Sequence, residues 1–250
     1  MLLLTVNPVT SRAHRYFVLV IILSVLSLPS FAKPSSDAVR LSDTPVIDGD
    51  VLGDTAWGER SLRGFWQQRP VEGAPSTQQT DVYIGYTDTI LYIGVVAYDD
   101  NPAGIIVADS RRDASLDNGD SLSFIIDAFQ DQQNGFVFGT NPVGIEHDAQ
   151  VSKEASGSMS RGAGFNLNWD TNWRVATKIG DYGWSAESEI PFKSLRFGNA
   201  DVQSWGFNFK RTIRRNNEVA YWAPISRQYS LSRLADARGC ICLLYTSDAA

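Results

Sequence analysis

The sequence NGDSLSFIIDAFQDQQNGFVFGTNPVGIEHD, residues 118–148, determines the expected fold of this chain. Residues 121–129 are apolar and rich in β-forming residues and contain no glycine or proline, which predicts a strand. The polar segment that follows ends in Asn134-Gly135, a pair that tolerates the positive φ of a tight hairpin turn. Residues 136–140 then return as the partner strand.

The first of these strands is apolar on both of its faces. Side chains alternate along a strand, so Leu122, Phe124 and Ile126 share one face, and Ile125 lies on the other. Only at Asp127 does a charged residue appear. This pattern predicts a central strand that is covered on both sides.

Three further segments have the alternating pattern of paired strands with a turn between them. They are residues 81–98, 173–190 and 205–224, with turns at 87–89, 180–183 and Asn216-Asn217. No long amphipathic helix appears between them. We therefore expect an all-β fold, an antiparallel, jelly-roll-like β-sandwich of about 8–10 strands.

The composition fits one globular domain and restricts the class of partner. The chain has 250 residues, of which 43% are hydrophobic and 20% are charged, enough for a sizeable core. Its net charge is −6 and its pI is about 4.9. Because phosphate binding needs a concentrated basic face, this acidic balance argues against nucleic acid as a partner.

Both ends of the chain differ in character from its middle. Residues 1–32 combine basic residues, an apolar run and a Ser30-Phe31-Ala32 site, which predicts a secretory signal peptide. The alternative, a membrane anchor, needs about 20 apolar residues, and this run is shorter. Residues 33–44 have the composition of a linker. Residues 240–250, CICLLYTSDAA, resemble translated adapter sequence. We therefore expect a native domain at 45–239, followed by a non-native tail.

Several strings in combination resemble the family 9 carbohydrate-binding-module-like domain. The resemblance is to the subgroup that precedes a predicted outer-membrane β-barrel in bacterial envelope proteins. The strings are PVIDGDVLGDTAW (45–57), LYIGVVAYDDNP (91–102), DSLSFIIDAFQDQQNGFVFGTNPVGIEHDA (120–149), WDTNWRVATKIGDYGWSAESEIPFKSLRFG (169–198) and WGFNFKRTIRRNNEVAYWAP (205–224). The resemblance implies a β-sandwich that binds oligo- or polysaccharides. Trp57 is expected in its core.

Candidate sugar-binding residues follow from the chemistry of β-sandwich lectins. Sugar rings stack on exposed aromatic rings, and Trp66 and Trp222 are the candidates for such a platform. Arg111 and Arg112 could bind sugar hydroxyls or carboxylates. A surface ion-pair cluster is the preferred interpretation of this arginine pair.

Acidic loop residues make calcium a second hypothesis, since hard cations take oxygen ligands. The candidates are Asp99, Asp100, Asp127 and Asp131, with Asp117 and Asp120 as further ones. The resemblance implies that a structural calcium ion can be present. No EF-hand spacing occurs.

The residues give little support to catalysis. A glycosidase needs two carboxyl groups across a cleft, and Glu187 and Glu189 share one face of a strand that looks solvated. His147 is the only histidine after residue 32, and no Gly-x-Ser-x-Gly elbow is present, which argues against a Ser-His-Asp hydrolase. Arg211 is expected to be half-buried and paired with a carboxylate such as Glu187 or Glu189.

Two functions remain open on the sequence alone. The first is a non-catalytic carbohydrate-binding module of an exported bacterial protein, associated with polysaccharide binding or catabolism. The second is a periplasmic docking domain for an outer-membrane barrel encoded in a missing C-terminal part, without sugar binding. An apolar patch near residues 229–234 would favour docking. Either function places the protein in the periplasm or at the outer membrane.

Overall fold

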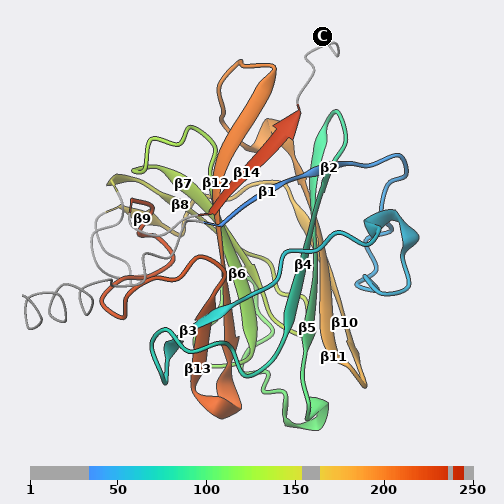
Figure 1. Ribbon diagram of the computed structural model, residues 1–250, viewed down its shortest axis with the longest axis vertical. Coiled ribbons are helices and arrows are strands. Elements are labelled where there is room, and N and C mark those ends of the chain that lie inside the picture. Colours follow the sequence, from blue (N-terminus) through green and yellow to red (C-terminus); the bar gives the residue numbers. More distant parts are fainter. Residues whose placement is uncertain (1–33, 154–163, 236–238, 245–250) are drawn as a thin grey trace, which may run out of the picture. The chain divides into compact units, whose positions relative to one another are not determined.

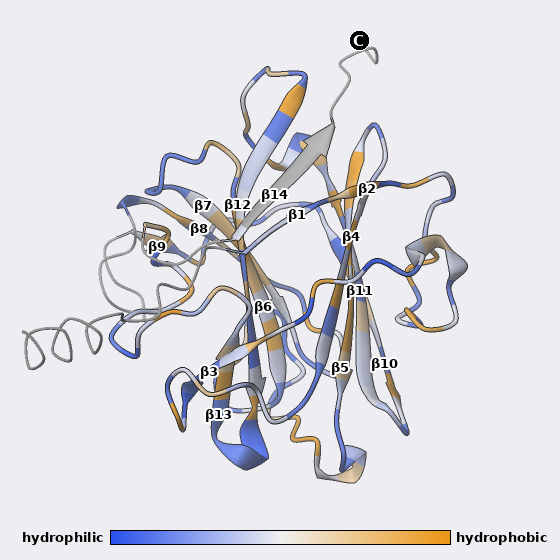
Figure 2. Ribbon diagram, viewed as in Figure 1, coloured by the Kyte–Doolittle hydropathy of each residue, from blue (hydrophilic) through white to orange (hydrophobic). Residues whose placement is uncertain are grey.

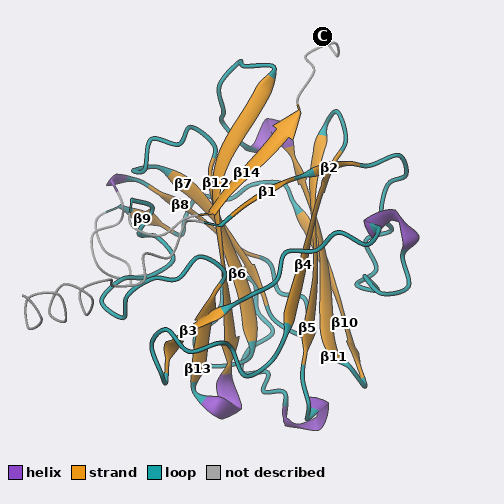
Figure 3. Cartoon of the chain, in the orientation of Figure 1, coloured by secondary structure: helices purple, strands orange, loops and turns teal. Residues whose placement is uncertain are grey.

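The computed structural model describes residues 34–153, 164–235 and 239–244, all of which belong to one compact unit. Two β-sheets form the layers of a sandwich (Figure 1). Helical structure in this part of the chain consists of short 3₁₀ turns (Figure 3). The expected β-sandwich is confirmed. The predicted signal peptide, residues 1–32, lies outside the described residues.

The larger sheet has nine strands in the order β1-β14-β12-β6-β7-β8-β9, with β13 beside β12 and β3 beside β13. Its strands are β1 (Ser35–Asp37), β3 (Trp66–Arg69), β6 (Ser121–Asp127), β7 (Gly135–Thr140), β8 (His147–Val151), β9 (Phe165–Asn166), β12 (Val202–Ile213), β13 (Glu218–Tyr221) and β14 (Gly239–Leu244). All pairs in it are antiparallel except β1 with β14.

The smaller sheet has five strands in the order β10-β11-β5-β4-β2. They are β2 (Val39–Arg40), β4 (Thr80–Tyr86), β5 (Ile90–Tyr98), β10 (Arg174–Gly180) and β11 (Gly183–Pro191). The turn between β10 and β11 uses Gly183 at a φ of 128°, where an added Cβ would lie 2.2 Å from the Ala97 carbonyl oxygen. Glycine is therefore required at this point by both backbone conformation and space.

The strand β6 is the centre of the larger sheet, as its sequence predicts. It pairs with β12 on one side and β7 on the other, and every residue in it is buried. The hairpins expected at 81–98, 173–190 and 205–224 are also present, as β4–β5, β10–β11 and β12–β13.

The main core lies between the inner faces of the two sheets. Phe124 of β6 packs against Phe138 of β7 and Phe209 of β12, with ring centroids 5.6 and 5.7 Å apart. Figure 2 shows apolar residues along the strands of both layers and hydrophilic residues in many of the connecting loops. On the outer face of the five-stranded sheet, Trp57 is buried at 5% exposure, as expected.

A second apolar cluster covers part of the outer face of the nine-stranded sheet. Leu231 and Leu234 pack there with Ile125 and Val137. Both leucines are at most 2% exposed. The stretch 229–234 therefore packs down onto the sheet and does not form the exposed apolar patch that would favour docking.

Two segments outside the expected domain also carry strands. β1 and β2 lie in the segment 33–44, for which the sequence predicts a linker. β14 lies largely in the segment 240–250 and pairs with β12 and β1. The non-native origin of that tail stays a prediction. Within the described ranges, no helix has both the length and the apolar character needed to cross a membrane.

A buried arginine connects the two sheets. Arg211 of β12 is 0% exposed. Its guanidinium donates to the carbonyls of Gln79 (2.7 Å) and Tyr98 (2.5 Å) and to the hydroxyl of Thr80 (2.9 Å), all in or beside the five-stranded sheet. Burial lowers the pKa of Arg211 to about 10, so it stays charged at neutral pH.

The sequence interpretation of this arginine was wrong in two respects. Arg211 is fully buried, not half-buried, and it bonds carbonyl oxygens, not Glu187 or Glu189. The carboxylates whose charges favour its ionised form are those of Asp99, Asp120 and Glu218. These partners come from three separate loops or strands, so local sequence spacing could not identify them.

We predict that Arg211→Met lowers the free energy of unfolding by about 3 kcal/mol or more, because it leaves buried carbonyls without donors and nearby carboxylates without a counter-charge. Urea unfolding followed by tryptophan fluorescence measures this change. The control is Arg174→Met on β10, where the arginine is exposed, and its effect should stay within about 0.5 kcal/mol. Equal effects of the two substitutions would contradict the role of Arg211 as the connection between the sheets.

Candidate functional site

A cleft of about 750 Å³ lies on the outer face of the nine-stranded sheet. Its lining includes residues of β3, β13, β12, β8 and β9, together with the loops 113–117 and 229–230. Leu116 of the loop 113–117 packs over Gly139 of β7, so this loop lies between the β3 and β8 sides of the cleft. The volume lies in the range of small-molecule sites, about 300–1,000 Å³.

The alternation of side chains along β12 creates the floor of this cleft. Phe209 and Arg211 point inward to the core and the inter-sheet connection. Lys210 and Thr212 therefore point outward, and both line the cleft. On the neighbouring strand, Tyr221 shares this outward face.

Lys210 places a positive charge in the floor. It is 6% exposed, and its Nζ donates to Asp117 at 2.8 Å. The ammonium group lowers the pKa of the Asp117 carboxyl. One donor of Lys210 is thus used within the protein, and an ammonium group has three.

Two side chains of the lining hold buried polar atoms that lack a hydrogen bond of good geometry within the described residues. They are Oγ1 of Thr212 and the ring nitrogens of His147, whose ring still interacts with the backbone of Ala114. His147 is 6% exposed and Thr212 is 5% exposed. Because buried polar groups almost always have a partner, these side chains are expected to turn their polar atoms toward solvent or a ligand in the cleft.

Burial also sets the protonation state of His147. Loss of solvation lowers the pKa of this imidazole, and this effect outweighs the charge of Asp113, a hydrogen bond with the Ala114 backbone, and the charges of Asp148 and Asp117, all of which favour the protonated ring. The ring is therefore neutral at neutral pH. A neutral imidazole has one nitrogen that donates and one that accepts.

Aromatic rings contribute to the floor and the rim. Tyr221 is 2% exposed, and burial raises the pKa of its hydroxyl. Tyr229 is half-buried at the rim, with the guanidinium of Arg233 4.6 Å from its ring centroid. Phe165 also lines the cleft.

The two predicted platform tryptophans have different surroundings. Trp66 is half-buried on β3 and is the cross-strand partner of Tyr221. It therefore shares the outer sheet face that carries the cleft. Trp222 is 4% exposed and packs against Phe209 in the core. Its ring is not an exposed platform, because the alternation along β13 and onward turns it inward.

Arg111 and Arg112 lie in ion pairs, in agreement with the preferred interpretation. Arg111 pairs with Asp109 at 2.6 Å. Arg112 pairs with the carboxylates of Glu146, Asp148 and Asp170. Neither arginine lines the cleft. That these two arginines contact sugar stays a prediction, and their ion pairs and their position outside the cleft lining do not favour it.

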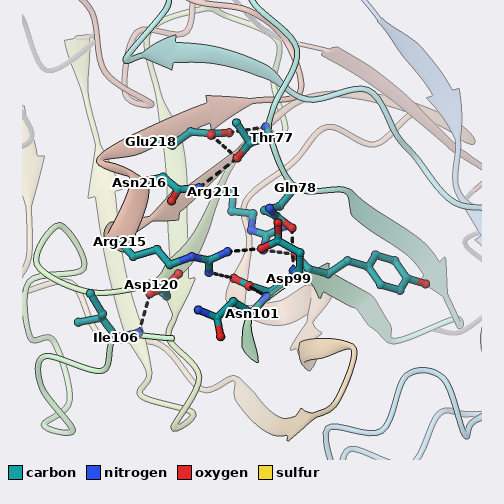
Figure 4. A network of polar contacts seen from close by, with 12 residues as sticks. Thr77, Gln78, Asp99, Asn101, Ile106, Asp120, Arg211, Arg215, Asn216 and Glu218 are labelled. Atoms are coloured by element: carbon teal, nitrogen blue, oxygen red, sulfur yellow. Dashed lines mark hydrogen bonds and ion pairs between the residues drawn. The ribbon is translucent and has the colours of Figure 1, made fainter. Parts of the chain in front are cut away.

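The acidic residues proposed as calcium ligands separate into different places. Asp99 and Asp100 both pair with Arg215, and Figure 4 shows Arg215 reaching Asp99 beside Arg211 and Asp120. Asp120 accepts a hydrogen bond from the backbone nitrogen of Ile106 at 2.7 Å.

Asp127 and Asp131 instead stabilise the turn after β6. Asp127 accepts from the backbone nitrogen of Gln132 at 3.1 Å, and Asp131 accepts from those of Gln133 and Asn134 at 2.8 Å. Over the described ranges, no three His, Cys, Asp or Glu side chains gather as metal ligands. These donors do not fit a calcium site, which needs six to eight oxygens.

Glu187 has a structural position, which corrects its expected place on a solvated face. It is 0% exposed. Its carboxylate accepts hydrogen bonds from the backbone nitrogens of Asp48 (3.1 Å) and Gly49 (2.8 Å) and from the indole of Trp57 (2.7 Å). Glu189 is paired with Arg174 at 3.1 Å. Glu187 thus anchors the segment 45–57 to β11.

Of the residues that line the cleft, sequence reasoning selected Asp117, as a possible calcium ligand, and missed Lys210, Thr212 and the role of His147. Lys210 and Thr212 could have been found, because they are polar residues alternating with Phe207, Phe209 and Arg211 in one buried strand. The position of His147 depends on the pairing of β8 with β7. No local motif indicates that pairing.

Comparisons with known proteins identify the fold. A family 9 carbohydrate-binding module from Caldicellulosiruptor kristjanssonii in complex with cellotriose is 17% identical, has a TM-score of 0.57 and aligns over 86% of this chain and 97% of that chain. The same module family from that organism in complex with glucose is 17% identical, with a TM-score of 0.55 and coverage of 86% and 99%. A suspected carbohydrate-binding protein from Bacteroides uniformis is 11% identical, with a TM-score of 0.63 and coverage of 84% and 99%.

The sequence matches no protein-family model, and comparison with curated proteins gives no significant match. At these identities the structural similarity shows a shared fold.

We predict that Glu187→Gln lowers the free energy of unfolding by about 1.5–3 kcal/mol, because an amide cannot accept all three hydrogen bonds in the place of a carboxylate. Thermal and urea unfolding measure the loss. Glu189→Gln on the same strand face removes a partly exposed ion pair and should change stability by about 0.5 kcal/mol or less. An unchanged stability for Glu187→Gln would show that this carboxylate does not anchor segment 45–57.

Proposed function

We propose that this domain is a non-catalytic carbohydrate-binding module and that it holds an oligosaccharide in the cleft on the outer face of the nine-stranded sheet. The observation that carries this proposal is the buried hydroxyl of Thr212, which has no hydrogen-bond partner among the described residues and lies in the same cleft lining as the imidazole of His147. A ligand that fits must supply several hydrogen-bond donors and acceptors along an extended surface.

Sugar hydroxyls meet this requirement because each can both donate and accept. The neutral imidazole of His147 offers one donor and one acceptor, and the hydroxyl of Thr212 offers both. Lys210 has further donors beyond its bond to Asp117. The rim ring of Tyr229 offers an apolar surface to a sugar ring, in the way aromatic side chains commonly do.

The fold similarity supports the same conclusion and suggests the first ligands for a test. Two of the structurally similar modules are described with cellotriose and with glucose. Gluco-oligosaccharides are therefore the natural starting panel, with xylo-oligosaccharides as a second one.

The cellular setting is part of the proposal. The basic and apolar pattern of residues 1–32 supports export, so we place the domain in the periplasm or at the outer membrane of a bacterium. The docking alternative gains no support from an apolar patch at residues 229–234, because Leu231 and Leu234 are buried against the sheet.

The test is isothermal titration of the purified protein with cello- and xylo-oligosaccharides, comparing the unmodified chain with Thr212→Val. This substitution keeps the shape of the side chain and removes a hydroxyl that has no protein partner. We expect it to leave thermal stability unchanged and to weaken binding about tenfold, the value of one or two lost hydrogen bonds.

Thr89→Val is the matched control, because Thr89 is exposed in the β4–β5 turn of the other sheet. It should bind like the unmodified protein. Saturable binding that Thr212→Val leaves unchanged would place the sugar elsewhere. A flat response to both panels by folded protein would contradict carbohydrate binding.

A further inference from the structure

The charged side chains of the cleft differ in whether they already have hydrogen-bond or ion-pair partners within the protein. Six formally charged side chains line it, three basic and three acidic: Arg69, Lys210, Arg214, Asp113, Asp117 and Glu218. The formal charges cancel, so the distribution of their partners decides which ligand charge the cleft favours.

Two of the three carboxylates are held by strong hydrogen bonds. Asp117 pairs with Lys210 at 2.8 Å. Glu218 is 0% exposed and accepts from the hydroxyls of Ser76 and Thr77, each at 2.6 Å, and from the Thr77 nitrogen at 3.0 Å.

The third carboxylate also has neighbours within the protein. Asp113 lies 3.7 Å from the Nε of Arg112 and accepts from the Asp148 nitrogen at 3.4 Å. All three acidic groups are thus engaged.

The two arginines of the lining differ from these carboxylates in having few partners of their own. Arg69 and Arg214 are exposed, and neither forms an ion pair with a carboxylate of the described residues. Arg214 donates one hydrogen bond, from Nη1 to the side chain of Asn217 at 2.8 Å. Each guanidinium has five N–H donors, so most of their donors are open to a ligand.

The topology brings both arginines to the same end of the cleft. Arg69 is the last residue of β3 and pairs across to Val219 of β13. Arg214 begins the 3₁₀ turn Arg214–Asn216 that joins β12 to β13. The His147 end of the cleft, in contrast, carries a neutral imidazole.

We propose that the cleft selects saccharides that carry an anionic group, which binds Arg69 and Arg214 while neutral hydroxyls extend toward Thr212 and His147. This inference rests on the proposed carbohydrate function and names its ligand class. Guanidinium groups match carboxylates and other planar or tetrahedral oxyanions through paired N–H donors. A uronic acid carboxylate and a sulfate ester are the two sources of this chemistry.

Because the protein as a whole is negatively charged, an anionic ligand can be selected only by contacts at close range. The net charge of −6 repels anions at a distance. Selection of an acidic sugar must therefore come from the guanidinium groups at close range, and removal of these two groups should abolish it.

The experiment compares matched saccharides by isothermal titration: a neutral xylo-oligosaccharide, the same chain with a glucuronic acid branch, a neutral cello-oligosaccharide, and its C6-oxidised and sulfated forms. We expect the acidic forms to bind at least about tenfold more tightly than their neutral parents. Comparison of the uronate forms with the sulfated form shows which oxyanion the cleft prefers. The preference should fall as sodium chloride rises.

The double variant Arg69→Gln/Arg214→Gln should lose this preference, so that it binds each acidic saccharide no more tightly than the neutral parent. Arg174→Gln, an exposed arginine on β10 of the other sheet, removes one equal charge and should retain the preference. Thermal unfolding confirms that each variant is folded, which is expected because all three arginines are exposed.

The outcomes separate this inference from the function on which it rests. Equal binding of neutral and acidic saccharides, or a preference that survives the double substitution, overturns the inference and leaves carbohydrate binding intact. A flat response to every saccharide overturns the proposed function and the inference together.

Discussion

The burial of one charged group, Arg211, is the constraint on which the arrangement of the two sheets depends. A guanidinium without solvent needs several acceptors in fixed directions. Here the carbonyls of Gln79 and Tyr98 supply them from the other layer. Because both carbonyls flank β4 and β5, the arginine sets where the five-stranded sheet lies relative to β12. Figure 4 shows Arg211 with the acidic residues Asp99, Asp120 and Glu218 around it.

The same strand carries the candidate site on its opposite face. With Arg211 fixed inward, Lys210 and Thr212 must point outward, and the loops 113–117 and 229–230 form walls around them. A buried threonine hydroxyl without a partner is costly in a face that only supports the fold. The proposed ligand surface would account for its presence in this strand. The inter-sheet connection and the cleft are thus two consequences of one alternating sequence.

The fold could be predicted from the sequence because its signals are local. The apolar run 121–129, the Asn134-Gly135 turn and the other hairpins each specify strands within a few residues of one another. The site depends on long-range pairing. His147 reaches the cleft only through the β7–β8 register, and Trp222 was predicted exposed because burial of a lone tryptophan cannot be read from its neighbours. The partners of Arg211 and Glu187 are more than 100 residues away in the chain.

The central claim is that the outer face of the nine-stranded sheet is the saccharide-binding surface. The most direct measurement is a crystal structure of the protein with a bound oligosaccharide. The account predicts sugar rings in the cleft, with hydroxyls within hydrogen-bond distance of Thr212 Oγ1 and a ring nitrogen of His147. A sugar bound instead on the opposite layer, for example at the small hollow between Trp57 and Tyr83, would contradict it.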